Sequence, residues 1–148
     1  MIINEIKAKG TLSVVLKDSN GNLKDERTIN NLVVDSGLNY IASRMKDATA
    51  TAMGYMAIGT GATAAAAGDT TLGTELDRNA VTSVTVTDES IAYVASWAAG
   101  DGTGAVTEAG IFNAASAGDM LARTVFSVVN KAANDTLSIT WTITLSAS

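Results

Sequence analysis

The clearest pattern in the chain is a strict alternation of apolar and hydroxyl-bearing residues near its end. The segment Thr136–Ser146 reads TLSITWTITLS, so its odd-numbered positions are apolar and its even-numbered positions are Thr or Ser. This period-two alternation predicts a β-strand with one packed face. The other face carries no charge, although a strand face in contact with water usually holds some Lys or Glu. We therefore expect it either to contact a partner or to be covered by the helix or loops of the same domain.

Three β-hairpins are predicted upstream of this strand. The first has Asn20-Gly21 at its turn, which is a strong hairpin signal because both residues tolerate positive φ. The second turns at Asp88-Glu89-Ser90, and the third turns through the small-residue loop Ala114–Asp119. The paired segments are, in chain order, Gly10–Lys17 with Leu23–Ile29, Val81–Thr87 with Ile91–Trp97, and Ala105–Asn113 with Met120–Val129.

Strands that recur about every ten residues, with turn signals between them, are typical of a β-sandwich or a related barrel. With Met53–Ile58 as a further buried strand, the chain is predicted to be mainly β. We expect an antiparallel β-sandwich or jelly-roll-like domain of about 8–9 strands, with the strand order left open. The segment Ala62–Gly68 is expected to be an exposed, mobile loop, and Thr70–Asp77 either a helical turn or a short extended segment.

One short α-helix is expected over about residues 35–46. Asp35 or Ser36 can cap its first turn by accepting backbone N–H bonds. A helix of about twelve residues is too short to be stable alone, so its apolar stripe is expected to pack on the sheet. The stripe has the i, i+3, i+4, i+7 spacing and consists of Leu38, Ile41, Ala42 and Met45.

Residues 10–148 are predicted to form a single β-sandwich domain, preceded by residues 1–9 as an N-terminal arm or a first strand. The length of 148 residues suits one domain with its own core. The apolar residues of the arm are Ile2, Ile3 and Ile6. An apolar arm can extend a neighbour's sheet through main-chain hydrogen bonds, so these three are candidate interface residues.

The composition excludes several kinds of chemistry. The chain has no cysteine and no histidine, so it lacks disulfides, thiolate metal sites and the commonest general base. Its net charge of −5, without a basic run, opposes binding to nucleic acid. No segment approaches the about 20 apolar residues of a membrane span, and no signal peptide is evident. We expect a soluble protein made in the cytoplasm, with no membrane partner.

The possible metal and phosphate sites in the sequence are better interpreted as turns. Asp18, Asn20 and Asn22 match the first ligands of a calcium loop, but the required glycine is missing and Ile29 stands where the last Glu should be. The glycine-rich segments Gly59–Gly61 and Gly100–Gly104 lack the Lys-Ser/Thr of a phosphate loop. No cofactor and no metal-binding residue is therefore predicted.

No catalytic residue is predicted either. Glu108 lies inside a predicted strand, where a pairing with Arg78 or Arg123 indicates a structural salt bridge. Glycan-processing sites usually offer aromatic platforms, whereas the tryptophans here fall in strand patterns that indicate core. The side chains expected in the core are those of Trp97, Phe126 and Trp141. We expect the protein not to be an enzyme.

Two long segments carry a resemblance to known proteins. Met53–Arg78 contains AIGTG and GDTTLGTELDR, while Thr107–Ser146 contains TEAGIFNA, LARTVF and DTLSITWTIT. With NYIASRM before them, they resemble a family of tailed-bacteriophage virion structural proteins. The resemblance runs from about Asn31 to the end of the chain. It implies a structural particle protein, either a capsid decoration (cement) protein or a tail-fibre or collar component.

A compact chain without fibrous repeats favours the decoration protein. The expected partners are the major capsid protein and copies of the chain itself, as a trimer or dimer, with no small-molecule substrate. The expected location is the virion, after synthesis in the host bacterial cytoplasm. On the last strand, Thr140 and Thr142 join Ile2, Ile3 and Ile6 as candidate interface residues. The alternatives are a tail-associated protein and, more remotely, a carbohydrate-binding module or small enzyme using Trp97 or Glu108.

Overall fold

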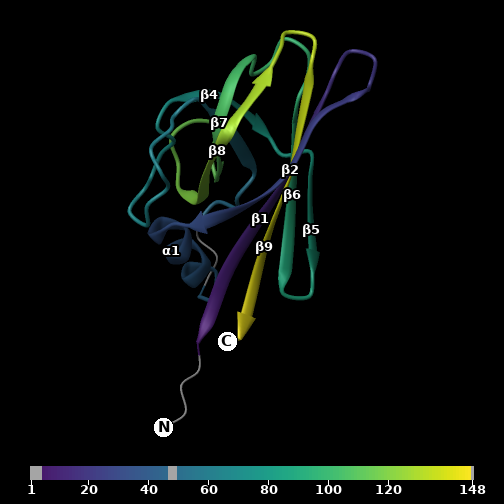
Figure 1. Ribbon diagram of the computed structural model, residues 1–148. Helices are drawn as coiled ribbons and strands as arrows, with labels where there is room; N and C mark the ends of the chain where they lie inside the picture. Colours follow the sequence, from purple (N-terminus) through teal and green to yellow (C-terminus); the bar gives the residue numbers. More distant parts are fainter. Residues whose placement is uncertain (1–4, 47–49, 148) are drawn as a thin grey trace.

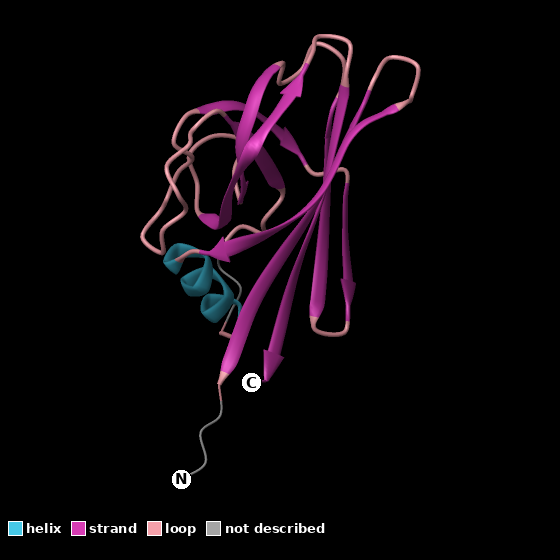
Figure 2. Ribbon diagram, in the orientation of Figure 1, coloured by secondary structure: helices cyan, strands magenta, loops and turns pink. Residues whose placement is uncertain are grey.

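The computed structural model describes residues 5–46 and 50–147 (Figure 1). The predicted positions Ile2 and Ile3 lie outside this part of the chain. Within it, nine antiparallel strands and one short helix confirm the mainly β prediction (Figure 2). The elements are β1 (Ile6–Lys17), β2 (Leu23–Val33), α1 (Asp35–Arg44), β3 (Tyr55–Gly59), β4 (Glu75–Ala80), β5 (Ser83–Thr87), β6 (Ser90–Trp97), β7 (Gly104–Phe112), β8 (Met120–Lys131) and β9 (Thr136–Ala147).

The strands form one curled sheet in the order β4-β3-β7-β8-β2-β1-β9-β6-β5. Strand β2 makes the bend, because most of its length pairs with β1 whereas Leu32 and Val33 pair with β8. The sheet therefore folds over itself into two facing halves (Figure 1). We call β2, β1, β9, β6 and β5 the first layer. The second layer comprises β4, β3, β7, β8 and the end of β2.

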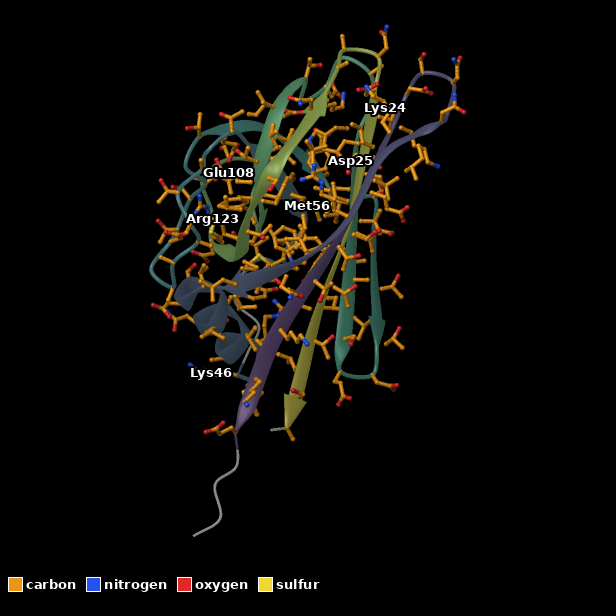
Figure 3. The ribbon with its side chains drawn as sticks, in the orientation of Figure 1. Lys24, Asp25, Lys46, Met56, Glu108 and Arg123 are labelled. Atoms are coloured by element: carbon orange, nitrogen blue, oxygen red, sulfur yellow. The ribbon has the colours of Figure 1, made fainter. Side chains whose placement is uncertain are left out.

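The core fills the space between the two layers. Leu12, Tyr93 and Trp141 stand opposite one another on neighbouring strands of the first layer, and all three are buried. Met56 of β3 joins the same core from the second layer (Figure 3). The apolar face of the last strand and the burial of Trp97 are thus confirmed, while Phe126 packs against the core only partly buried.

All three predicted hairpins are present, with small changes in extent. Strand β1 begins at Ile6, so residues 6–9 belong to the first strand and pair with the end of β9. In the segment 70–77, which was predicted to be either a helical turn or extended, the residues from Glu75 onward form the start of strand β4. At the first turn, Gly21 has φ of 80° and its N–H donates to the carbonyl of Asp18.

Two details of the predicted helix are wrong. Val34 occupies the N-cap position without a side-chain cap, Asp35 lies in the first turn, and the Ser36 hydroxyl donates to the Met120 carbonyl at 2.7 Å. The predicted apolar stripe also does not pack as a unit. Leu38 and Met45 are 46% and 84% exposed.

The contact between helix and sheet explains this orientation. Gly37 is buried against β8, where an added Cβ would lie 2.0 Å from the Leu121 carbonyl oxygen. The helix backbone therefore approaches the sheet at Gly37, and the half-buried Tyr40 and Ile41 follow it inward. Leu38 and Met45 are turned away from the core, because the closest approach selects the side of the helix that has no side chain.

Candidate interaction surface

The hydroxyl-bearing side of β9 lies on the outer side of the first layer. Thr142 stands between Thr11 of β1 and Ala92 of β6 in the sheet register. In the same way, Thr140 stands between Ser13 and Val94. Neighbouring side chains on one sheet face lie about 5 Å apart, so these small residues form a continuous surface.

Small, uncharged side chains occupy the outward positions of all five strands of this layer. We call these outward residues together the hydroxyl face. It consists of Thr28 and Asn30 of β2, Thr11, Ser13 and Val15 of β1, Ser138, Thr140, Thr142 and Thr144 of β9, Ser90, Ala92, Val94 and Ser96 of β6, and Thr85 and Thr87 of β5.

The hydroxyl face has an uncharged centre and a charged rim. Its members carry no ionisable side chain, whereas Lys9 and Lys17 border it at the two ends of β1 and Glu26 borders it on β2. Ser90 and Thr144 share a hydrogen bond of 2.9 Å across the β6–β9 pair. Charged residues are depleted at the centres of protein interfaces and enriched toward their rims, and the hydroxyl face has this distribution.

Helix α1 does not cover the hydroxyl face. It packs against β8 of the second layer instead, on the other side of the core (Figure 2). The central residues Thr140 and Thr142 are half-buried by their neighbours in the sheet. Of the coverings considered within the domain, the helix is therefore excluded.

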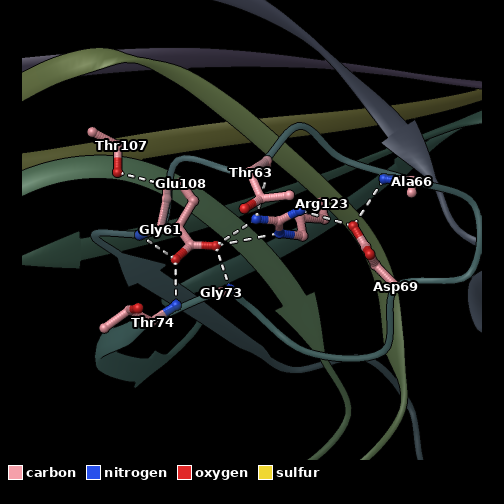
Figure 4. Close-up of polar contacts among 9 residues, drawn as sticks. All are labelled: Gly61, Thr63, Ala66, Asp69, Gly73, Thr74, Thr107, Glu108 and Arg123. Carbon is pink, nitrogen blue, oxygen red and sulfur yellow. Dashed lines mark hydrogen bonds and ion pairs between the residues drawn. The ribbon is translucent and has the colours of Figure 1, made fainter.

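Glu108, the acidic residue considered for chemistry, lies in a different part of the molecule and is fully buried (Figure 3). Its carboxylate accepts backbone N–H bonds from Gly61, Gly73 and Thr74 at 2.6, 2.7 and 2.8 Å. It also pairs with Arg123, at 3.0 Å from its Nη2 atom (Figure 4). Burial alone would raise the pKa of Glu108, but these donors outweigh it and hold the pKa below its ordinary value.

Arg123 continues this network to the neighbouring loop. It pairs with Asp69 at 2.8 Å and donates to the Thr63 carbonyl at 3.0 Å (Figure 4). The backbone N–H of Ala66, followed by Arg123, keeps the pKa of Asp69 low despite some desolvation. The loop expected to be mobile is thus tied at several points to β7 and β8.

The network assigns Glu108 a structural role. Both oxygens of its carboxylate accept hydrogen bonds from the chain itself, so neither faces a substrate. Of its two predicted partners it selects Arg123, while Arg78 pairs with Glu75 and lies 3.7 Å from the Phe112 ring centroid. Trp97, the other residue of the carbohydrate-binding alternative, is also fully buried and cannot stack on a sugar.

The sequence did not indicate that Lys131 is buried. Lys131 is almost fully buried and donates from Nζ to the Ala98 carbonyl at 2.9 Å. Its burial lowers the pKa of the ammonium group. It lies at the end of β8, and no pattern in the sequence marks it.

In the turn whose sequence resembles a calcium loop, the carboxylate of Asp18 bonds to the backbone of the turn itself. Asp18 accepts the backbone N–H groups of Asn20 and Asn22, each at 2.9 Å. Across residues 5–46 and 50–147, no group of three or more acidic side chains is arranged to hold a metal ion. The helix of the described chain is too short to cross a membrane.

No protein-family model, curated protein or solved structure matches this chain.

Proposed function

We propose that this protein is a non-enzymatic structural component of a tailed-phage virion, a decoration (cement) protein that binds and stabilises the assembled head shell. The observation that carries the proposal is the hydroxyl face, a five-stranded surface whose centre holds only Thr, Ser, Asn, Ala and Val. The resemblance of residues 53–78 and 107–146 to phage virion proteins supplies the biological setting.

The chemistry of the hydroxyl face suits a protein partner. Thr and Ser carry both donors and acceptors on short, stiff side chains, so little conformational entropy is lost when a partner immobilises them. The lack of charge at the centre avoids the large cost of desolvating ions. A rim with Lys9, Lys17 and Glu26 can then set orientation by electrostatic complementarity.

The proposed mechanism is stabilisation by mass action. A protein that binds the assembled shell, and not its separate subunits, lowers the free energy of the assembled state by RT ln(1 + [L]/Kd) for each occupied site. The effect accumulates over the copies on one shell. The expected partners are the major capsid protein and further copies of this chain.

The interface is tested by placing charge at the centre of the hydroxyl face. In the Thr140→Lys/Thr142→Lys double variant, affinity for heads that lack the decoration protein is expected to fall at least about tenfold, equivalent to about 1.4 kcal/mol. Cosedimentation with purified heads measures it. Thr70→Lys/Thr71→Lys adds the same charge to exposed positions on the opposite side of the molecule and serves as the matched control.

The outcomes separate the possible roles of the face. Lost binding with an unchanged thermal midpoint supports an interface, whereas equal binding of both double variants overturns it. If only the Thr140→Lys/Thr142→Lys variant unfolds, Thr140 and Thr142 are needed for folding and do not form an interface.

The second candidate is a tail-associated protein, which the same resemblance allows. Copy number distinguishes the two, because closed symmetric tail assemblies contain about a dozen copies or fewer, whereas a shell coat requires hundreds. Quantitative mass spectrometry of purified virions, with the major capsid protein as internal standard, gives this number. A tail-like copy number would contradict the decoration proposal.

A further inference from the structure

An apolar groove opens at one end of the sandwich, beside the start of β1. It encloses about 510 Å³ between helix α1 and the first layer. Tyr40, Ile41 and Leu121 line the wall on the helix side. Ile91, Ile143 and Leu145 line the opposite wall on β6 and β9.

The groove exists because the first layer continues past the second. At this end of the molecule β1, β9, β6 and β5 extend beyond the strands of the second layer (Figure 1), and Leu145 lies near the end of β9. The edge strand β5 contributes Val84 and Val86, which point to the inner side in register with Tyr93 and Ile91. Val86 is nevertheless 69% exposed.

The exposed side of α1 extends this apolar surface. Ile41 lines the groove, and Leu38 and Met45 stand on the same stripe of the helix but outside the groove. Large apolar side chains gathered at one place on a surface mark sites of protein association. Leu38 and Met45, which were expected to pack within the domain, are therefore available to another molecule.

The start of β1 lies at the same end of the molecule as the groove. Ile6 pairs with Ala147, and Ala8 pairs with Leu145, which lines the groove. Ile6 itself is 78% exposed. The five residues before it, MIINE, include Ile2 and Ile3 and span at most about 17 Å when extended.

We infer that the groove binds the N-terminal segment, Met1–Glu5, of a second copy of this chain. A segment of the same molecule would first have to reverse direction, and a reverse turn uses about four residues. That would leave about one of its five residues to enter the groove. A segment from a neighbouring copy needs no such turn and can bring both isoleucines into contact.

The free edge of β5 gives this segment a defined orientation. Strand β5 is the last of the sheet order, so its outer backbone groups are available to pair with an added strand. An added strand would place alternate side chains beside Val84 and Val86, on the face of the sheet that lines the groove. Repetition of this head-to-tail contact closes a ring of identical subunits where the rotation between copies returns to the first copy, and otherwise builds an open filament.

The segment alone buries less than a standard protein interface of about 1,600 Å². The exposed stripe with Leu38 and Met45 lies beside the groove and adds to the contact. This inference specifies the self-association contained in the proposed function. The self-association is tested on the isolated protein, without phage heads. Loss of self-association would therefore leave the proposed binding to the head untouched, and loss of head binding would leave the self-association untouched.

Sedimentation velocity over a concentration series tests the contact. The wild type is expected to self-associate, and both Ile2→Asp/Ile3→Asp and Val86→Asp are expected to weaken association at least about tenfold. Leu23→Asp alters an exposed apolar residue on the distant first hairpin and should leave association unchanged. Since Val86 and Leu23 are both largely exposed, neither variant is expected to lose its fold, which circular dichroism verifies.

Disulfide trapping identifies the molecule that supplies the segment. The chain has no cysteine, so a mixture of Ile3→Cys and Val86→Cys single variants reports only the introduced thiols. A cross-linked species of the mixed pair supports the inference. A wild type that is monomeric at all concentrations overturns it. So does a double variant, Ile3→Cys/Val86→Cys, that cross-links only within one chain.

Discussion

Glu108 and Arg123 form a buried ion pair, 3.0 Å apart, across the β7–β8 strand pair. Neither residue bonds only to the other. The carboxylate accepts three backbone N–H groups from the segment 61–74, and the guanidinium reaches Asp69 and Thr63 in the same segment. Two strand residues thus fix the path of a long loop that has almost no large apolar side chain of its own.

We expect Glu108→Gln to destabilise the protein by about 3–5 kcal/mol, because it breaks a buried pair and leaves Arg123 with only the half-buried Asp69 as a charged partner. The amide would also place a donor among N–H groups that need an acceptor. Urea unfolding, monitored by tryptophan fluorescence, gives the change in the free energy of unfolding. Asp25→Asn removes a half-exposed pair with Arg27 and should cost at most about 1 kcal/mol. Equal effects of the two substitutions would contradict a structural role for the network.

The stability of the protein should decrease in acid. The pKa of Glu108 is lowered from 4.5 and that of Asp69 from 3.8 in the folded state. As the pH falls, the unfolded chain therefore binds protons before the folded one does. The stabilisation is complete above pH 4.5 and is lost as the pH falls through the lowered folded values.

Urea midpoints measured from pH 7 to pH 3 test this dependence. The Glu108→Gln variant is expected to lose less stability over this range than the wild type, because it lacks one of the carboxylates whose pKa is lowered in the folded state. Part of the dependence should remain, since Asp69 and Asp135 also have lowered pKa values, the latter through hydrogen bonds from Lys24 and the Ala132 backbone. An identical pH profile for the two proteins would show that Glu108 does not carry the effect.

Gly37 determines how close the helix lies to the sheet, so Gly37→Ala should be destabilising. Alanine gains at most about 1 kcal/mol in helix propensity. Its Cβ would meet the Leu121 carbonyl oxygen at 2.0 Å, and relieving such overpacking costs about 1–3 kcal/mol. The steric cost of the added Cβ is therefore larger than the gain in helix propensity. Asn39→Ala, at an exposed position of the same helix, should be neutral or slightly stabilising in the same thermal-unfolding measurement.

A gain in stability for Gly37→Ala would mean that the helix can move away from Leu121 at little cost. The apolar groove would then be adjustable in width, because Tyr40 and Ile41 on the helix form one of its walls.

Much of this fold is determined locally and is therefore visible in the sequence. The period-two pattern of Thr136–Ser146, the Asn20-Gly21 turn and the hairpins depend on neighbouring residues, and the structure contains all of them. The same local pattern separated the packed side of β9 from its hydroxyl side. It also indicated that Glu108 pairs with an arginine, because a carboxylate inside a strand requires a partner.

The remaining features arise from contacts between residues far apart in the chain. Amphipathic spacing on α1 predicted an inward stripe, but the contact of Gly37 with Leu121 turned Leu38 and Met45 outward. The choice of Arg123 over Arg78 follows from the β7–β8 register. Only the bend at β2 brings the two layers together and leaves the groove at their uneven end, because register and layer overlap are properties of the whole sheet and not of any one strand.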